Sequence, residues 1–261
     1  MKRLVALISL IAITYITTIA GVIKLEGVYQ GKNLYVMNPF SASGVGFCVY
    51  EVTVNGQVTT DEINSSAFEV DLSIFQFNNG DRLVVEIKHK ENCQPKVLNP
   101  EILKPKSTFN TTDIKVVEDQ LKWTTTGEVG KLDYIVEQYR WNKWYKVGVV
   151  PGKGTTGTNS YSIDVNLHSG TNTFRVKQVD YTKVPRYSPE VTYRSTKPPV
   201  SFSPKRPDNE IIFSDETLYE IYDYYGNIVL KGKGTKVNVS RLKSGKYFLL
   251  FDNEQGGFTK K

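Results

Sequence analysis

One glycine-rich segment of the chain has the spacing of a phosphate-binding loop. Residues 152–157, GKGTTG, satisfy the pattern Gly-x-Gly-x-x-Gly. Such a loop binds phosphate when it follows a strand and opens a helix whose N-terminal amides face the anion. The residues that come next, TNSYSIDV, are typical of a turn and a strand. The sequence therefore predicts a glycine-rich loop here, without a cofactor.

Other side chains that could do acid–base or metal chemistry are scattered. The two histidines, His89 and His168, fall in different segments, so neither a metal cluster nor a Ser-His-Asp set is easily assembled. Carboxylate pairs such as Asp215-Glu216 lie in expected turns, where solvent exposure is the default. A glycosidase built from two distant carboxylates is left open, but no residue points to it. We expect no enzyme, no catalytic residue, no metal and no cofactor.

Composition favours β structure. Aromatic residues make up 12% of the 261 residues and include sixteen tyrosines, while long helical runs of Ala, Leu, Glu and Lys are missing. The formal net charge is +6, but the basic residues are scattered singly among acidic ones. Nucleic-acid binding calls for a concentrated basic stripe or a known reading module. We therefore expect no nucleic-acid partner.

The N-terminus has the layout of a secretory signal peptide. Two positive charges precede an apolar run over residues 4–16, and Thr18 and Ala20 suit the −3 and −1 positions of a cleavage site. An uncleaved membrane anchor is the alternative, since apolar character continues to Ile23. Because threonines interrupt the run, we expect residues 1–20 to be removed and the protein to leave the cytoplasm.

The two cysteines lie in the first third of the chain. An oxidising compartment permits a disulfide between Cys48 and Cys93. The alternative is two buried thiols that pack as small apolar residues. The sequence alone does not place the two Cα atoms, so both possibilities stay open.

Residues 21–104 are expected to form a first β-sandwich. In FCVYEVTVNGQV, the alternate residues Cys48, Tyr50, Val52 and Val54 are predicted to share one face, and the Asn-Gly pair that follows is a hairpin signal. Further runs, AFEVDL and RLVVEIKHK, repeat this alternation. Several short strands separated by turn residues are typical of a sandwich.

Two further β modules are predicted after a proline-bearing linker. Residues 108–195 hold seven short predicted strands, the size of a fibronectin type III or immunoglobulin-like sandwich: 114–117, 121–124, 134–139, 144–149, 161–164, 173–179 and 187–192. Residues 196–261 begin with a proline-rich spacer and continue with four strands, YEIYD, NIVLKG, KVNVS and KYFLLFD. The predicted fold is all-β: three tandem sandwich modules of the immunoglobulin/fibronectin type III kind after a signal peptide.

The second module resembles a known family. LKWTTTGEVGKLDYIVEQYRWNKWYKVGVVPGKG and SGTNTFRVKQVD are similar to the fibronectin-type modules of surface proteins exported by the bacterial type IX secretion route. The hairpin RWNK departs from the family's usual Asp-Gly turn. By this resemblance Trp123 and Trp144 should be core residues, whereas Trp141 lies at the hairpin tip. Trp141 is either a recognition anchor for a glycan or partner protein, or it folds onto Tyr139 or a neighbouring domain.

The last sixty residues resemble the type A C-terminal sorting domain of type IX secretion substrates. The resemblance is carried by YEIYDYYGNIVLKGKGTKVNVSRLKSGKYFLL and the final GFTKK. The positions that we take as the sorting motif are Tyr219, Asp223, Gly226, Leu242, Gly245, Tyr247, Lys260 and Lys261. The two terminal lysines are the best candidates for contact with a secretion receptor. The entry SPKRPDNEI and the short closing strand depart from the family, so the domain is either cleaved after export or kept.

These features predict a secreted, non-enzymatic β protein at the cell surface or outer membrane of a Gram-negative bacterium. Its role would be adhesion, scaffolding or binding, with the secretion receptor and, further, envelope proteins or surface glycans as partners. One alternative is an accessory component of the secretion or gliding apparatus that retains its C-terminal domain. Another is a glycan-binding module that uses Trp141.

Overall fold

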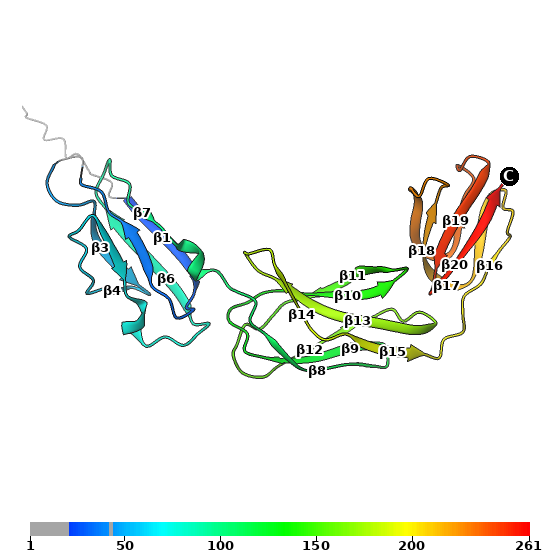
Figure 1. Cartoon of the computed structure of the whole chain (residues 1–261), viewed down its shortest axis with the longest axis horizontal. Coiled ribbons are helices and arrows are strands. Elements are labelled where there is room, and N and C mark those ends of the chain that lie inside the picture. The colour runs from blue at the N-terminus through cyan, green and yellow to red at the C-terminus, as the bar shows by residue number, and fades with distance from the viewer. Residues whose placement is uncertain (1–20, 42–43) are drawn as a thin grey trace, which may run out of the picture. The chain divides into compact units, whose positions relative to one another are not determined.

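The computed structural model describes residues 21–41 and 44–261, so the predicted signal peptide lies outside the described residues. The described chain is built from strands, with two four-residue 3-10 helices, and it divides into two compact units (Figure 1). The first unit ends at residue 103, except that residues 79–81 belong to the second, which continues from residue 104 to 261. Among these residues, no helix has the length and apolar character needed to cross a membrane.

The first unit contains two antiparallel sheets that enclose one core. Their strand orders are β1-β6-β3-β4 and β5-β2-β7. The elements are β1 Gly21–Val28, β2 Leu34–Met37, β3 Val49–Val54, β4 Gln57–Val58, β5 Ala67–Val70, η1 Leu72–Phe75, β6 Arg82–His89, β7 Lys96–Val97 and η2 Pro100–Leu103. Apolar side chains from both sheets form a single hydrophobic cluster. The predicted alternation in β6 is confirmed, because Leu83, Val85 and Ile87 are fully buried.

The predicted face of β3 needs one correction. Val52 and Val54 are buried as expected, but Tyr50 is 45% exposed and Val49 is buried instead. The register of β3 against β6 shifts between Val49 and Glu51, which marks a β-bulge. A bulge inserts one extra residue, so Val49 takes the inward position that a strict alternation gives to Tyr50. Cys48 is buried as expected, in its disulfide with Cys93. The strict period of two in the sequence could not show this shift.

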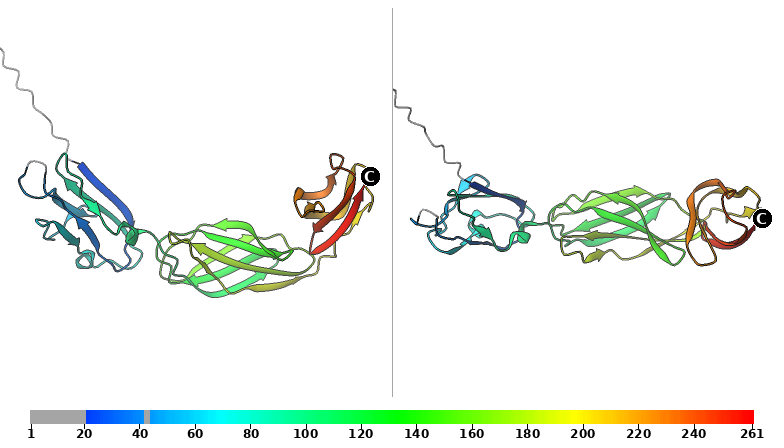
Figure 2. Two further views of the ribbon diagram at one scale, coloured as in Figure 1. Left: turned by 45° about the horizontal axis from the view of Figure 1, so that its top comes forward. Right: turned by 90° about the horizontal axis from the view of Figure 1, so that it is seen from above.

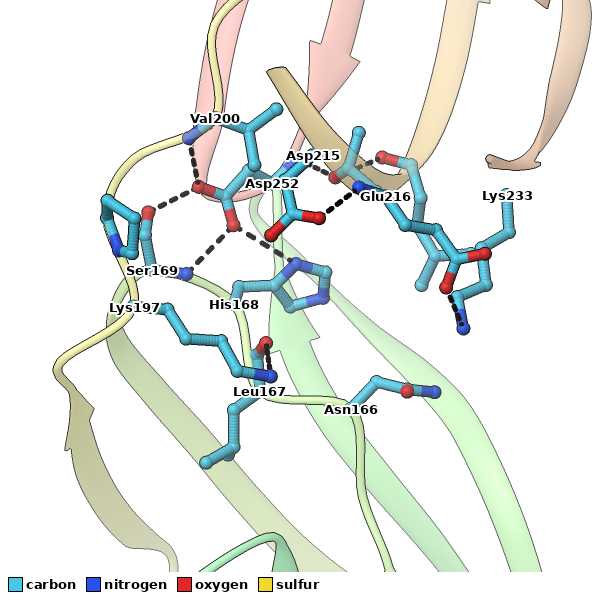
Figure 3. A pocket seen from close by; sticks show the side chains of 13 residues that line it. Asn166, Leu167, His168, Ser169, Lys197, Val200, Asp215, Glu216, Lys233 and Asp252 are labelled. Carbon is cyan, nitrogen blue, oxygen red and sulfur yellow. Dashed lines mark hydrogen bonds and ion pairs between the residues drawn. The ribbon is translucent and has the colours of Figure 1, made fainter. Parts of the chain in front are cut away.

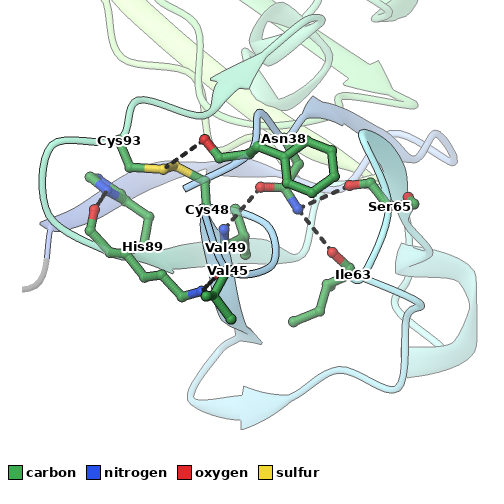
Figure 4. The surroundings of a disulfide bond; sticks show 10 residues. Asn38, Val45, Cys48, Val49, Ile63, Ser65, His89 and Cys93 are labelled. Atoms are coloured by element: carbon green, nitrogen blue, oxygen red, sulfur yellow. Dashed lines mark hydrogen bonds between the residues drawn. A yellow bond between two sulfur atoms is a disulfide. The ribbon is translucent and has the colours of Figure 1, made fainter. Parts of the chain in front are cut away.

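A disulfide ties the start of β3 to the loop after β6 in the first unit. Cys48 and Cys93 are bonded, with their Cα atoms 5.7 Å apart (Figure 4). The buried Asn38 side chain braces the same region: its amide donates to the carbonyl oxygens of Ile63 and Ser65, and its oxygen accepts from the amide of Val49 at 2.9 Å. The bridge and this amide network hold four segments of the first unit together: the residues after β2, the start of β3, the loop before β5 and the loop after β6.

In the second unit, residues 110–195 form a two-layered arrangement that we call the sandwich (Figure 2). One layer has the order β11-β10-β13-β14, with β15 also paired to β13, and the other has the order β12-β9-β8. The strands are β8 Asn110–Val117, β9 Gln120–Thr126, β10 Tyr134–Arg140, β11 Lys143–Val150, β12 Asn159–Asp164, β13 Gly170–Val179, β14 Pro185–Tyr187 and β15 Val191–Ser195.

The core of the sandwich contains Trp123, which is 1% exposed, so its predicted core position is confirmed. The last predicted strand is in fact two strands, β14 and β15, which both pair with β13. Pro189 lies between them and has no amide hydrogen for a ladder bond. At this interruption Ser188 bonds to Val176 through both its amide and its side-chain oxygen.

Residues 202–261 form a curled sheet that we call the tail (Figures 1 and 2). Its strands are β16 Phe202–Ser203, β17 Glu210–Tyr222, β18 Ile228–Asn238, β19 Gly245–Phe251 and β20 Glu254–Lys260. The order is β16-β17-β19-β20, with β18 also paired to β17, and one hydrophobic cluster fills it.

One turn that the sequence predicts in the tail is absent. The sequence predicts two strands separated by Gly232-Lys233-Gly234, but β18 runs continuously through this segment. Gly232 serves another purpose: it faces Tyr219 across the ladder, and a Cβ built there would lie 2.6 Å from the tyrosine hydroxyl. Glycine at this position therefore leaves space for the Tyr219 ring and does not form a turn.

Candidate functional site

The turn between β17 and β18 is built by two predicted motif residues. The Asp223 carboxylate accepts hydrogen bonds from the amides of Tyr225 and Asn227, both at 2.9 Å, and from the Asn227 side chain. These bonds from Asn227 are the main cause that lowers the pKa of Asp223. Gly226 has φ +83°, which favours glycine. The turn holds Tyr224 and Tyr225 at its tip, where they are 76% and 86% exposed.

The other motif positions in the body of the tail shape its core and turns. Tyr247 stacks on Phe258 with ring centroids 5.3 Å apart and donates its hydroxyl to the carbonyl of Lys243. Leu242 packs against the tail core, and Gly245 has φ +153°. Tyr219 stacks on Phe213 in the same core, with ring centroids 5.6 Å apart. Their role as an export motif stays a prediction, but each has a defined structural task.

The two terminal lysines differ in their surroundings. Lys260 is 9% exposed, whereas Lys261 is exposed and its ammonium lies 3.6 Å from Asp208. The backbone around them is anchored as well: the amide of Thr259 donates to the carbonyl of Lys205, and the amide of Lys261 to that of Pro207. The end of β20 is thus fixed to the proline-rich entry of the tail, and Lys261 is the more accessible of the two.

A buried polar network joins the tail to the sandwich (Figure 3). Asp252, between β19 and β20, is 2% exposed. Its carboxylate accepts from the amide of Ser169 at 2.8 Å, from the Ser169 hydroxyl, and from the amide of Val200 at 3.2 Å. Burial opposes ionisation, but these hydrogen bonds keep the pKa of Asp252 below its usual value. The adjacent Asn253 side chain donates to the carbonyls of Ser169 and Thr171.

His168 completes this network between two charged partners. Its Nδ1 lies 3.4 Å from the Asp252 carboxylate and its Nε2 lies 3.0 Å from the Arg140 guanidinium. Burial lowers the pKa of His168 to about 4, with the Arg140 charge adding to the effect and Asp252 opposing it. The imidazole is therefore neutral at pH 7. A proton on Nδ1 lets it donate to Asp252 while Nε2 accepts from Arg140.

This set of residues does not have the geometry of a catalytic triad. Ser169 bonds to Asp252 rather than to the imidazole, and the ring nitrogen that would activate a serine is occupied by Arg140. Sequence reasoning missed the cluster because it treated His168 alone. The segment HSG before a strand and the turn DNE are ordinary loop sequences, so no local pattern reveals that they meet. A polar cavity of 190 Å³ lies beside the network.

A second contact comes from the β10–β11 hairpin of the sandwich. Trp141 and Asn142 at its tip have φ of +49° and +62°, the conformation of a tight two-residue hairpin turn. The Trp141 indole donates to the carbonyl of Asp252 at 3.0 Å, and the Tyr145 hydroxyl donates to Glu220 at 3.1 Å. Trp141 therefore lies against the tail, as the neighbouring-domain alternative expects, and the anchor hypothesis stays a prediction.

Trp144, expected in the core, lies on the outer face of its sheet. It is opposite Tyr139, which is 41% exposed, and residues directly opposite in a ladder share a face. The Arg175 guanidinium covers the indole at 3.8 Å from its centroid and also donates to Glu137. A cation–π stack on the surface thus replaces the predicted burial.

The glycine-rich segment 152–157 is a loop that leads into strand β12, as predicted. The amide of Gly154 donates to the buried carboxylate of Glu128 at 2.8 Å. The hydroxyls of Tyr134 and Tyr161 donate to the same carboxylate at 3.0 and 2.8 Å. A backbone amide that would face an anion in a phosphate loop here binds the protein's own side chain. Within residues 21–41 and 44–261, no group of three His, Cys, Asp or Glu side chains is placed to hold a metal ion.

The strands and cores define an all-β protein whose second unit ends in a small, docked β domain. Residues 203–261 match the family described as "Secretion system C-terminal sorting domain". The chain therefore ends in a domain of this family, and the match does not extend to the remaining residues. No curated protein matches the chain.

The comparison with solved structures finds several proteins with low similarity to the chain. A tetra-tandem repeat from the extending region of a large adhesion protein has a TM-score of 0.29 and 12% identity, covering 92% of this chain and 73% of that one. The fibronectin(III)-like modules of Clostridium thermocellum CbhA give 0.22 and 10%, covering 59% and 93%. Chicken CNTN1 FN1–FN3 domains give 0.25 and 10%, covering 91% and 97%. These scores are low, so the fold assignment rests on the strands and cores themselves.

Proposed function

We propose that this protein is exported through a type IX-like route and acts at the cell surface or outer membrane as a non-enzymatic adhesion, scaffolding or binding protein. The observation that carries the proposal is the sorting-domain match over residues 203–261. That segment folds as a sheet with its own core. A secretion receptor can recognise the surface of such a folded sheet. The division of the chain at residues 104–108 and 195–196 into three modules is part of the same proposal.

A binding role agrees with the character of the polar clusters. The buried network around Asp252 and the one around Glu128 use hydrogen bonds between protein groups and leave no catalytic arrangement at either place. The first unit and the tail both carry exposed aromatic residues, Phe40 at 67% and Tyr225 at 86%, which are available for contacts with other macromolecules. These features favour presentation of a surface over chemistry.

Export is tested by shortening the C-terminus. Deletion of Lys260 and Lys261 removes the end of β20 and its bond to Pro207, so we expect the protein to accumulate in the periplasm. The measurement is the amount of protein in surface, outer-membrane and periplasmic fractions. A Lys236→Gln variant, which removes an exposed charge from β18 without shortening the chain, serves as the control. Normal surface delivery of the deletion variant would argue against the sorting role.

A second candidate is an accessory component of the secretion or gliding apparatus that retains its C-terminal domain. The contacts that hold the tail on the sandwich favour this candidate, because Asp252, Asn253 and Glu220 are all engaged by sandwich residues. Co-purification with outer-membrane complexes separates it from a surface cargo. A glycan-binding role has less support, since the Trp141 indole already has a partner in the tail.

A further inference from the structure

Four exposed apolar side chains of the tail lie together at one end of its sheet. They are Tyr224, Tyr225, Ile228 and Phe248, which are 76%, 86%, 48% and 55% exposed. The two tyrosines are at the tip of the β17–β18 turn, while Ile228 and Phe248 lie directly opposite Tyr222 on its two sides. Residues opposite one another in a ladder share a face. These four residues, which we call the patch, therefore form one apolar surface of the kind that marks interaction sites.

The β17–β18 turn holds the two tyrosines in a fixed position. The amide of Asp223 donates to the carbonyl of Asn227 at 3.0 Å, and the amide of Gly226 donates to the carbonyl of Asp223 at 3.1 Å. These bonds add to those that the Asp223 carboxylate accepts. The rings of Tyr224 and Tyr225 meet edge to face, with their centroids 5.8 Å apart. A turn that is ordered before binding loses little conformational entropy when a partner takes up its side chains.

Two positive charges flank the patch. Lys246 is exposed and lies on the same face of β19 as Phe248, because one residue separates them. Lys231 is exposed as well and pairs with Glu220, which shares the face of Tyr222. The Glu220 carboxylate is buried and accepts two tyrosine hydroxyls. Because the two exposed charges beside the patch are both positive, a complementary partner surface carries carboxylates.

We propose that the patch is where the tail binds the secretion receptor, and that the receptor supplies an apolar pocket for Tyr224 and Tyr225 with acidic side chains at its rim. Aromatic side chains that enter a partner's pocket dominate the binding energy of many interfaces. The sorting-domain match covers the whole patch. Along the β19–β20 ladder, Lys260 pairs beyond Phe248 on the side of the turn, so one of the predicted terminal lysines is at the same end of the sheet.

A protein pocket fits this surface better than a lipid bilayer does, because two rings held edge to face on an ordered turn match a cavity of defined shape. This inference rests on the proposed export. It goes beyond it by assigning the receptor contact to residues outside the predicted sorting motif: Asp223 and Gly226 shape the turn, and Tyr224 and Tyr225 make the contact.

The decisive experiment measures surface delivery of a Tyr224→Ser/Tyr225→Ser double variant of the full chain. Both side chains are mostly exposed, so the tail should fold normally, and the fraction of protein at the cell surface should fall about tenfold as the protein accumulates in the periplasm. Tyr224→Phe/Tyr225→Phe restores both rings and should recover most of this loss, because the ring and not the hydroxyl fills the pocket. The control Ile212→Ser changes an exposed apolar residue of β17 outside the patch and should be delivered normally.

Wild-type delivery of the double serine variant overturns the inference and leaves the proposed export intact. A wild-type chain that does not reach the surface contradicts the proposed function itself, and the inference falls with it. Thermal unfolding of the purified variants shows whether the tail is folded. If the double serine variant is unfolded, Lys246→Glu decides: this charge reversal beside Phe248 should lower the surface fraction about threefold, and unchanged delivery overturns the inference.

Light scattering and vesicle binding of the purified full chain test the other occupants of the patch. We expect a monomer that does not bind vesicles of phosphatidylethanolamine and phosphatidylglycerol. A dimer that the double serine variant dissociates would assign the patch to a second copy of the chain. Vesicle binding that the same variant abolishes would assign it to a lipid surface. Either result overturns the receptor contact.

Discussion

At the scale of single residues, His168 is the group most sensitive to its surroundings. It is 6% exposed and lies between the Arg140 guanidinium and the Asp252 carboxylate, with the Lys197 ammonium also close enough to disfavour protonation. A second proton would sit on Nε2 and point at a cation. The network therefore holds only with a neutral ring.

This arrangement makes the stability of the second unit depend on pH. The pKa of His168 is about 4 in the folded protein and 6.5 when free, so its contribution is complete above pH 6.5 and is lost as the pH falls towards 4. Between pH 7 and pH 5 the free energy of unfolding should drop by about 2 kcal/mol from this residue. Chemical denaturation at both pH values measures the drop. His168→Gln should flatten the dependence and His89→Gln should not; equal slopes in both variants would contradict this account.

The contact of Trp141 with the tail should contribute to the stability of the second unit. Trp141→Ala removes the indole from the tail and should lower the free energy of unfolding of the second unit by roughly 2 kcal/mol. Trp141→Phe keeps a ring but loses the hydrogen bond to the carbonyl of Asp252, and should cost about 1 kcal/mol. Denaturant titrations of the three proteins give the values. Unchanged stability in Trp141→Ala, together with lost glycan or partner binding, would favour the anchor hypothesis instead.

At the scale of elements, the β17–β18 hairpin contains three glycines with different structural roles. Gly226 occupies the left-handed region at the turn, while Gly232 accommodates the Tyr219 ring inside β18. The φ of Gly234 lies outside the left-handed region, and a Cβ added there would meet its nearest atom at 3.6 Å. The three residues look alike in the sequence but have different tolerance for a side chain.

Gly226→Ala should therefore destabilise the tail by about 1–2 kcal/mol, because φ +83° strains any residue with a Cβ. The matched control is Gly234→Ala in the same hairpin, where we expect a change within about 0.5 kcal/mol. Thermal unfolding followed by circular dichroism compares the two variants. Equal destabilisation would mean that the turn conformation is not what limits substitution at Gly226.

At the scale of the whole molecule, the two compact units should unfold separately, while the sandwich and the tail unfold together because they share the Asp252 network. Calorimetry should show two transitions in the wild type and a third in Asp252→Ala.

The disulfide of the first unit closes a segment with a sequence separation of 45, which stabilises this unit by about 4 kcal/mol in the chain-entropy account. Reduction should lower the first unit's transition alone; a shift of both transitions would refute this division.

The all-β class, the alternating core of β6, the burial of Trp123 and the family of the final domain could all be predicted from the sequence. Each depends on local periodicity or on a motif contained within one segment, which a linear pattern records. The other features depend on contacts between segments that are distant in the sequence. A bulge in β3 exposed Tyr50, and pairing opposite an outward residue placed Trp144 on the surface. Asp252 and His168 are 84 residues apart, and only folding brings their loops together. Patterns along a chain encode which face a residue prefers, but contacts between distant loops depend on how completed sheets pack.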